Sequence, residues 1–325
     1  MRLSRRAQRG IAAFLYCAFF SFSATSEEVV VSHYGTQLNT AAIAVALERG
    51  DFKKHGIDIT GVLTAAGGGT SMRNLLAGEL PYGEMGTSGV LAAHKQGVNI
   101  RIVNAASRTL EDLLWVTMPN SPVKSIKDLA GRKIAITSAK SITQLLSQMA
   151  FDAEGIAPGK YQQIALGSVA AGLTALEQGN VDAAPILEPL WSSRAGRYRV
   201  AFDLSKLPSM TQTVGVTTVE YATKHPDKLR AIIAARRDAV DFIYANPEEA
   251  AKMMSKQFGS NTLPVDVAIR AVKNMVAIRY WSPGNIEMSG LEAMVDGMKR
   301  LGQWEGPVEW DKIVDRSYLP SDLQK

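Results

Sequence analysis

The chain has 325 residues, with 36 lysines and arginines against 31 aspartates and glutamates, and it contains four histidines and one cysteine. The basic surplus of +5 is concentrated at the N-terminus, because residues 1–26 carry four arginines and no acidic residue. The rest of the chain has a net charge of about +1, which excludes a nucleic-acid footprint built on surplus basic charge.

Residues 1–26 have the parts of a secretory signal. Basic "MRLSRRAQRG" precedes apolar "IAAFLYCAFFSF", and the small residues Ala24 and Ser26 precede Glu27. We expect cleavage between Ser26 and Glu27; an uncut N-terminal anchor is the alternative, although the apolar stretch is too short to span a bilayer. Cys17 would leave with this segment, which excludes thiol catalysis and thiolate metal sites in the exported protein.

Strand-like and helix-like segments alternate through the first two thirds of the chain. Expected strands cover 29–35, 56–62, 82–87, 100–107, 113–118, 132–137, 161–166, 182–187 and 198–204. Expected helices between them cover 40–52, 70–80, 89–97, 141–156 and 169–181, and in 141–156 the apolar residues recur at helical spacing. This alternation predicts mainly parallel sheets with helices on both faces.

The last third is predicted to be mostly helical. After an extended segment at 210–218, helices are expected at 225–246, 246–258 and 263–281. Pro226 suits a helix start, and one face of the first helix consists of Leu229, Ile232, Ile233, Arg236, Val240 and Ile243.

The stretch "TAAGGGTSMRNLL" stands where a strand turns into a helix. A helix start exposes unpaired N–H groups with partial positive charge, Gly69 allows a close approach, and Thr70 and Ser71 add hydroxyls. No lysine follows the glycines, and their spacing fits no dinucleotide fingerprint. Read by itself, the stretch fits either an anion site or a capped turn.

Two further junctions have the same chemistry. Thr87 and Ser88 in "MGTSGVLAA" lie between a strand and a helix, and Ser138 and Ser141 lie at another helix start. Thr143 and Lys140 stand beside the latter; alone, each hydroxyl is a cap and the lysine is solvated. Because parallel sheets bind ligands beyond the carboxyl ends of their strands, helix starts from two sheets are predicted to face one another across a cleft.

Other candidates occupy comparable positions. Tyr34 and Gln37 follow the first strand and suit stacking and amide donation, whereas for His33 we favour a satisfied, partly buried imidazole. Glu188 in "PILEPLW" either receives an amine or hydroxyl or acts as a solvated or capping acid. For Trp191 we favour packing over a pocket wall.

Enzyme motifs are absent from the sequence. The histidines have no metal-binding spacing such as HExxH, and there is no GxSxG elbow. The acidic residues are scattered, and no pair can be placed face to face.

The chain resembles the solute-binding proteins of ABC importers, in the nitrate, sulfonate, taurine and thiamine-precursor group. The segments that carry the resemblance are "ALERGDFKKHGIDI", "GGTSMRNLLAGELPYGEMGTSG", "SIKDLAGRKIAITSAKSITQLL", "ALEQGNVDAAPILEPLW" and "EYATKHPDKLRAII". They occur in the family's order and cover nearly the whole exported chain. With no cysteine after residue 17, we do not expect the thiamine-pyrimidine synthase activity of some relatives.

The resemblance implies a type II periplasmic-binding-protein fold, with two α/β lobes joined by two crossings and a ligand cleft between them. The first lobe is expected to comprise 27–107 and 215–325, with the C-terminal helices packed on it, and the second lobe 108–214. The crossings are placed near 108–116 and 209–214. The lobes are expected to close about the hinge over the ligand.

The resemblance also implies the site and its partners. Tyr34 would form a wall, and Thr70, Ser88, Ser138 and Ser141 would donate to ligand oxygens. The full set of implied ligand-binding residues is Tyr34, Gln37, Gly69, Thr70, Thr87, Ser88, Ser138, Ser141 and Glu188.

The implied protein is a monomeric periplasmic receptor without catalysis, cofactor, metal or nucleic acid, which delivers a small organic anion or zwitterion to an inner-membrane ABC permease and its ATPase. The ligand would be a carboxylate or sulfonate, and Glu188 would suit a zwitterion such as an aminosulfonate. The alternatives are an enzyme on the same fold, such as a lyase or desulfinase acting on an aromatic acid, and the ligand-binding subunit of a sensor.

Overall fold

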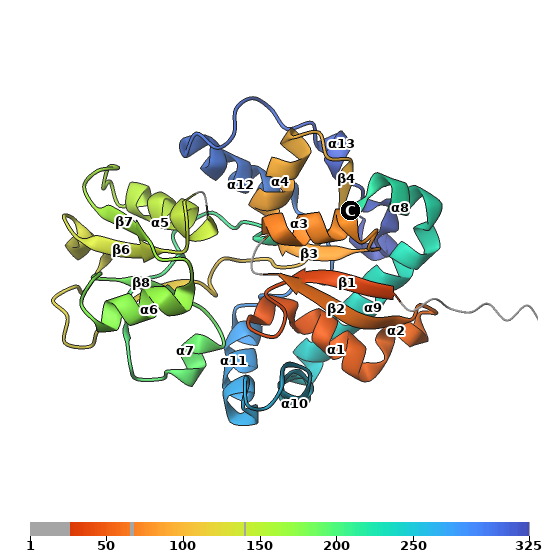
Figure 1. Cartoon of the computed structure of the whole chain (residues 1–325), viewed down its shortest axis with the longest axis horizontal. Coiled ribbons are helices and arrows are strands. Elements are labelled where there is room, and N and C mark those ends of the chain that lie inside the picture. The colour runs from red at the N-terminus through yellow and green to blue at the C-terminus, as the bar shows by residue number, and fades with distance from the viewer. Residues whose placement is uncertain (1–26, 66–67, 140, 325) are drawn as a thin grey trace, which may run out of the picture.

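The structure is a computed structural model that describes residues 27–65, 68–139 and 141–324. The expected signal segment, its cleavage site and Lys140 lie outside the described residues. Figure 1 shows two lobes side by side along the long axis of the molecule.

The first lobe is built on a five-stranded sheet with the order β2-β1-β3-β10-β4. β1 pairs in parallel with β2 and β3, whereas β10 is antiparallel to β3 and β4. The strands are β1 (Glu27–Ser32), β2 (Ile59–Ala65), β3 (Gly83–Gly86), β4 (Ile100–Ala105) and β10 (Thr213–Thr218).

The second lobe repeats this order. β8 and β9 flank β5 in an antiparallel sheet, and β6 pairs in parallel with β7. A parallel bridge from Ile134 to Ala183 places β6 beside β8, which gives the overall order β7-β6-β8-β5-β9. The strands are β5 (Leu114–Thr117), β6 (Lys133–Ile136), β7 (Gln162–Ala165), β8 (Ala184–Ile186) and β9 (Arg199–Phe202).

The sheets are mainly parallel, as expected, because four strands of each run in one direction, but one strand of each is reversed, β10 in the first sheet and β5 in the second. The chain crosses between the lobes from β4 to β5 and from β9 to β10, so β5 and β10 each enter a sheet from the other lobe. Parallel neighbours need a crossover helix, but a strand that arrives directly is free to run antiparallel. The chain leaves the first sheet after Ala105 and returns at Thr213; the expected lobe boundaries stay a prediction.

Helices cover both sheets, and many begin within a few residues of a strand end. Those of the first two thirds are α1 (Ala41–Arg49), α2 (Asp51–Lys54), α3 (Gly68–Ala77), α4 (Thr87–Lys95), α5 (Ile142–Ala153), α6 (Val169–Glu177) and α7 (Leu190–Ser193), with the 3₁₀ turns η1 (Leu38–Thr40) and η2 (Ile126–Leu129). The C-terminal part has α8 (Val219–Lys224), α9 (Pro226–Ala245), α10 (Pro247–Phe258), α11 (Val265–Ala277), α12 (Met288–Arg300), α13 (Trp310–Ile313), η3 (Arg316–Tyr318) and η4 (Ser321–Leu323).

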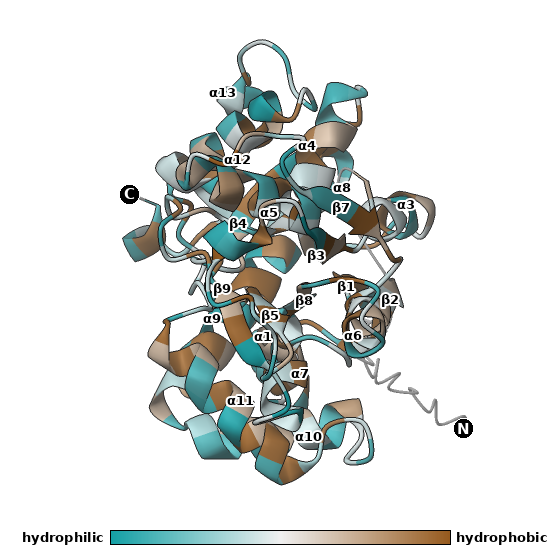
Figure 2. Ribbon diagram, turned by 90° about the vertical axis from the view of Figure 1, so that its left-hand side faces the viewer, coloured by the Kyte–Doolittle hydropathy of each residue, from teal (hydrophilic) through white to brown (hydrophobic). Residues whose placement is uncertain are grey.

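The C-terminal helices pack on the first lobe through amphipathic faces. α9 starts at Pro226, and all six residues expected on its apolar face are buried. α1 packs against α9 and α10, and Figure 2 shows apolar and polar residues interspersed along α10 and α11. Within the described part of the chain, no helix has both the length and the apolar character needed to cross a bilayer.

Arg236 is the polar member of the buried α9 face, and it is only 1% exposed. It pairs with the fully buried Glu84 of β3 and donates to the carbonyls of Ala106 and Ser282. A buried guanidinium needs a charged partner and satisfied donors, and this network supplies both. It also ties the start of the first crossing to α9.

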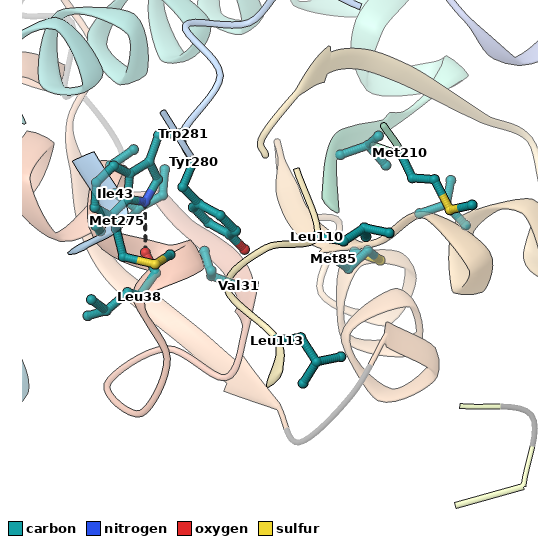
Figure 3. Packing of buried hydrophobic residues seen from close by; sticks show 14 of the residues in the cluster. Val31, Leu38, Ile43, Met85, Leu110, Leu113, Met210, Met275, Tyr280 and Trp281 are labelled. Atoms are coloured by element: carbon teal, nitrogen blue, oxygen red, sulfur yellow. Dashed lines mark hydrogen bonds between the residues drawn. The ribbon is translucent and has the colours of Figure 1, made fainter. Parts of the chain in front are cut away.

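The two crossings are tied to each other and to the segment after α11. The N–H groups of Ala106 and Ser107 donate to the carbonyl of Thr213, and Ser209 Oγ donates to the carbonyl of Arg108. Figure 3 shows Trp281 Nε1 bonded to the carbonyl of Leu38, with Tyr280 extending from there toward the first crossing.

Two C-terminal helices also touch the second lobe. α11 contacts α7, and α12 contacts α5 as well as α4, and Figure 1 shows each pair side by side. No separate helix was predicted from the sequence at the position of α12. The C-terminal part therefore packs on the first lobe and also meets the second.

Candidate functional site

Most predicted ligand-binding residues lie in or next to loops at the carboxyl ends of β1, β3, β6 and β8, here called the strand-end loops (33–37, 86–88, 137–139 and 187–189). Figure 1 shows the chain after β1 on the side of the first lobe that faces the second. Strand ends of this kind are where α/β sheets bind ligands, because helix starts follow them.

In the loop after β1, Tyr34 is held against α10. Its hydroxyl donates to Gln257 Oε1 at 3.3 Å, and its ring meets Phe258 edge-on at 5.2 Å between centroids. Burial, with a smaller contribution from the charge of Glu48, raises the pKa of Tyr34 to about 12. Gln37 is half-buried, and its backbone precedes η1. Tyr34 is therefore held in place by α10, and its hydroxyl stays protonated at neutral pH.

At the start of α3, two hydroxyls have different roles. Thr70 is exposed, and its Oγ1 accepts from Arg73 at 2.9 Å, whereas Ser71 is fully buried and shares a 2.6 Å hydrogen bond with Ser32. A side chain at Gly69 would meet only Arg73, at 3.9 Å. Arg73 thus adds a cation beside Thr70, one helical turn beyond the glycines. Arg73 was not among the ligand-binding residues predicted from the sequence.

At the start of α4, Thr87 is structural. It is fully buried, its N–H donates to the carbonyl of Gln212, and its Oγ1 donates to the carbonyl of Thr211 at 2.6 Å. Ser88 is half-buried, and its hydroxyl makes no hydrogen bond to any described residue. Thr87 therefore ties α4 to the returning crossing.

At the start of α5, hydroxyls cap the helix. Ser141 Oγ accepts from the N–H of Gln144 at 3.3 Å and shares a 2.9 Å hydrogen bond with Thr143 Oγ1, which accepts from the N–H of Thr137. Ser138 is exposed, and its N–H donates to Ser141 Oγ at 3.4 Å. The capping role foreseen for these residues is present, and the network holds the helix start in one conformation.

Glu188 is 5% exposed and belongs to an interlobe contact. Its carboxylate accepts from the N–H and hydroxyl of Ser192 in α7 at 3.0 and 2.9 Å, and from Asn274 Nδ2 of α11 at 2.7 Å. Trp191 packs against the core of the second lobe, as expected. Three donors satisfy much of the Glu188 carboxylate, so this acid joins the second lobe to α11.

Asp112, in the first crossing, is a buried acid that no sequence motif marked. It is 7% exposed, and its Oδ1 has no hydrogen-bond partner among the described residues. Burial raises its pKa to about 8, and the nearby charge of Glu188 adds to the shift. The hydroxyl of the buried Tyr280 reaches Gln212 of the second crossing at 3.0 Å. Both crossings therefore carry polar groups that water does not reach freely.

Two cavities lie elsewhere. One of about 340 Å³ lies beside the crossings and is lined by residues such as Arg108, Ser209 and Arg279, and one of about 350 Å³ lies on the second lobe beside Lys124 and Lys206. None of the nine predicted residues lines either cavity. Among residues 27–65, 68–139 and 141–324, no group of three or more His, Cys, Asp or Glu side chains could hold a metal ion.

The predicted residues thus divide into two groups. Gly69, Thr70 and Ser138 are exposed, and Ser88 and Gln37 are half-buried, with Thr70 bonded only to the exposed Arg73; Tyr34, Thr87, Ser141 and Glu188 are engaged in contacts that position helices or loops. None of the hydrogen bonds within the described chain joins a predicted residue of one lobe to a predicted residue of the other.

Two mixed α/β lobes with matching strand order, joined by two crossings, define the periplasmic-binding-protein fold. The aliphatic sulphonate binding protein SsuA from Escherichia coli shares it, with a TM-score of 0.72 at 19% identity over 88% of this chain and 91% of that chain. The nitrate-binding protein NrtA from Synechocystis PCC 6803 gives a TM-score of 0.74 at 15% identity over 93% and 91%. The fold predicted from the sequence is confirmed.

The family model described as NMT1/THI5 like matches residues 37–250, and the chain belongs to this family. The taurine-binding periplasmic protein of Escherichia coli K12 is 26% identical over 234 residues, which cover 71% of each chain. A putative aliphatic sulfonates-binding protein of Bacillus subtilis 168 is 24% identical over 297 residues, covering 90% of this chain and 87% of that protein. The resemblance to the sulfonate, taurine and nitrate group is confirmed.

Proposed function

We propose that this protein is the periplasmic receptor of an ABC importer and that it captures a small organic anion or zwitterion of the sulfonate or carboxylate class between its lobes. The observation that carries the proposal is the set of strand-end loops, which place helix starts and hydroxyls on both lobes. N–H groups at helix starts favour anions, and serine and threonine hydroxyls donate to anionic oxygens. Relatives named for taurine and aliphatic sulfonates support this ligand class.

Ser88 and Thr70 are the donors we assign to the ligand from the first lobe, and Ser138 is the donor from the second. Arg73 supplies positive charge beside Thr70. Glu188 keeps its place in the proposed site, but its protein donors already satisfy much of its carboxylate. A ligand ammonium is therefore compatible with the site without being required by it.

We further propose that the protein delivers its ligand to a membrane permease, that its signal is cleaved before Glu27 and that it is a monomer. Closure of the lobes about the crossings would bury the ligand through contacts made only in the closed form. An assay for product formation discriminates binding from turnover, because product formed in excess of protein would identify an enzyme.

The first test is a thermal-shift screen of the exported chain against sulfonates, carboxylates, nitrate and pyrimidines. A ligand that binds only the folded protein raises the melting temperature, and it does so more as its occupancy increases. We expect sulfonates or carboxylates to raise it; a shift with pyrimidines alone would contradict the ligand class.

The second test is calorimetry with Ser88→Ala. Loss of one hydroxyl donor to an anion costs about 1.5 kcal/mol of binding free energy, or roughly tenfold in affinity. The melting temperature of the free protein should stay unchanged, because the Ser88 hydroxyl has no partner among the described residues. The matched control is Ser260→Ala, which removes an exposed hydroxyl far along the chain after α10. Equal affinities of wild type and Ser88→Ala would remove Ser88 from the site.

A further inference from the structure

His33 adopts a backbone conformation that is uncommon for residues other than glycine. It directly follows β1, its N–H donates to the carbonyl of Ala65 at the end of β2, and its φ is 62°. A non-glycine residue in this left-handed region carries a conformational cost, and residues of this kind concentrate at binding sites. Backbone hydrogen bonds to Ala65, Thr36 and Gln37 hold this conformation at the carboxyl ends of two parallel strands, on the side of the first lobe that faces the second (Figure 1).

The imidazole of His33 has no partner within the described part of the chain. Neither ring nitrogen makes a hydrogen bond to a residue in the described ranges, and neither is sealed from solvent. By contrast, His55 Nε2 lies 2.9 Å from Asp238 Oδ2. His33 is partly buried, as expected, and its ring has no hydrogen-bond partner among the described residues.

The surroundings of His33 disfavour its charged form. Burial lowers its pKa from the ordinary histidine value, so the ring is neutral at pH 7. The titratable groups around its loop do not offset this, because Tyr34 stays protonated and Glu48 of α1 is paired with Lys256 of α10. An anion placed beside the ring would be the missing counter-charge.

We propose that His33 contacts the ligand in the interlobe site and that binding of an anionic group there adds one proton from solvent to its imidazole. This inference rests on the receptor function proposed above. Since a neutral imidazole becomes a cationic donor, the ligand gains an ion pair that the free protein lacks. The protein thus binds its anion together with a proton, and its affinity depends on pH.

The direction of the effect follows from linkage. The free ring is neutral and the bound ring is protonated, so affinity rises as pH falls through the histidine range, by up to about tenfold per pH unit. Below the pKa of the free ring both states are protonated, and the affinity becomes constant.

The test is calorimetry with ethanesulfonate and taurine between pH 5.5 and 8, in phosphate and in Tris or bis-Tris. Sulfonate buffers are avoided because they belong to the proposed ligand class. Wild type is compared with His33→Asn, which tolerates a positive φ but cannot titrate, and with His55→Gln as the matched control. Imidazole proton resonances recorded against pH, with and without ligand, give a readout that needs no variant.

We expect buffer-dependent binding heats that report uptake of close to one proton near pH 7, and a His33 resonance that titrates at higher pH when ligand is bound. His33→Asn should lose the proton uptake and flatten the pH profile, while His55→Gln should keep both. Binding of the sulfonates with a flat profile and no proton uptake would overturn this inference and leave the receptor function standing. Failure of both sulfonates to bind at any pH would overturn the inference and count against the proposed ligand class.

Discussion

Two buried carboxyl groups near the crossings differ in how many hydrogen-bond donors they have. Glu188 accepts three hydrogen bonds from Ser192 and Asn274, which compensate for the water its carboxylate loses on burial. Asp112 is similarly buried, but its Oδ1 has no partner among the described residues, and burial raises its pKa to about 8. Desolvation that donors do not offset favours the neutral acid. Asp112 is therefore largely protonated at pH 7.

This difference predicts how stability depends on pH. The folded protein keeps the Asp112 proton up to about pH 8, whereas an unfolded chain releases it near pH 4. The folded state binds more protons in that window, so this residue's contribution to the free energy of unfolding falls as pH rises from about 4 to about 8. The fall amounts to about 6 kcal/mol at most.

Asp112→Asn mimics the neutral acid and should remove this residue's contribution to the pH dependence of the free energy of unfolding. Urea denaturation at pH 5, 6, 7 and 8 should therefore show the variant gaining stability relative to wild type as pH rises. Asp311→Asn, at an exposed position in α13, is the control and should parallel wild type. Parallel curves for Asp112→Asn as well would mean that this carboxyl is ionised in the folded protein.

At the scale of elements, the position of β10 between its neighbouring strands depends on one glycine, Gly215. β10 lies between β3 and β4, and a Cβ at Gly215 would stand 2.0 Å from Asn104 Oδ1 and 2.3 Å from Tyr82 Oη. Those two side chains are hydrogen-bonded to each other at 2.9 Å and are fully buried. The returning strand fits the sheet because this position has no side chain.

Gly215→Ala should destabilise the protein by about 3 kcal/mol, because a methyl group would overpack the site and break a buried hydrogen bond. Gly86→Ala is the control: Gly86 ends β3 with φ −58°, and a Cβ added there would meet no atom within 4 Å. Chemical denaturation should show a change of less than about 1 kcal/mol for the control. Equal stability of the two variants would contradict the close packing at Gly215.

At the scale of the whole molecule, the lobes are joined by more than the two crossings. α11 meets α7 through the hydrogen bond from Asn274 to Glu188, and α12 meets α5, where Gly297 faces Leu145 and Met149. These contacts come from segments far apart in the sequence. The lobe closure proposed above would have to break or make these contacts, because rotation about the crossings moves the two lobes relative to each other.

Asn274→Ala should shift the lobes toward a more open arrangement. Loss of one hydrogen bond to a carboxylate changes the free-energy difference between the open and closed forms by about 1.5–3 kcal/mol. The ratio of open to closed protein then changes roughly 10- to 100-fold. Small-angle X-ray scattering of the free protein should show a larger radius of gyration. Lys273→Ala, which removes an α11 side chain paired with Glu248 of α10, should not change the scattering. Unchanged scattering for Asn274→Ala would show that this bond does not hold the lobes.

Much of the fold could be predicted because helix and strand signals are local. The alternation located β1 to β10 and most helices, and the α9 face with Arg236 is buried as expected. The antiparallel entry of β5 and β10 was missed, because strand direction depends on which lobe the chain arrives from. α12 was not singled out within a part of the chain that was expected to be mostly helical.

The site was less predictable for a related reason. Hydroxyls at helix starts are visible in sequence, but only packing decides that Thr87 is bonded to Thr211 while Ser88 is left open. No sequence signal marks His33 as a residue with a φ of 62°, or Asp112 as an acid that is buried in the first crossing. These features arise from neighbours distant in the chain.

By itself, the amino-acid sequence determined most of the elements, their order along the chain and the family, because these depend on residue spacing and on motifs read along one strand or helix. Only the tertiary structure decided which polar groups have partners, which acid keeps its proton, and which helices join the lobes. The physical reason is that hydrogen bonding, desolvation and interlobe contact are properties of the space around a side chain, and that space is formed only when distant segments meet.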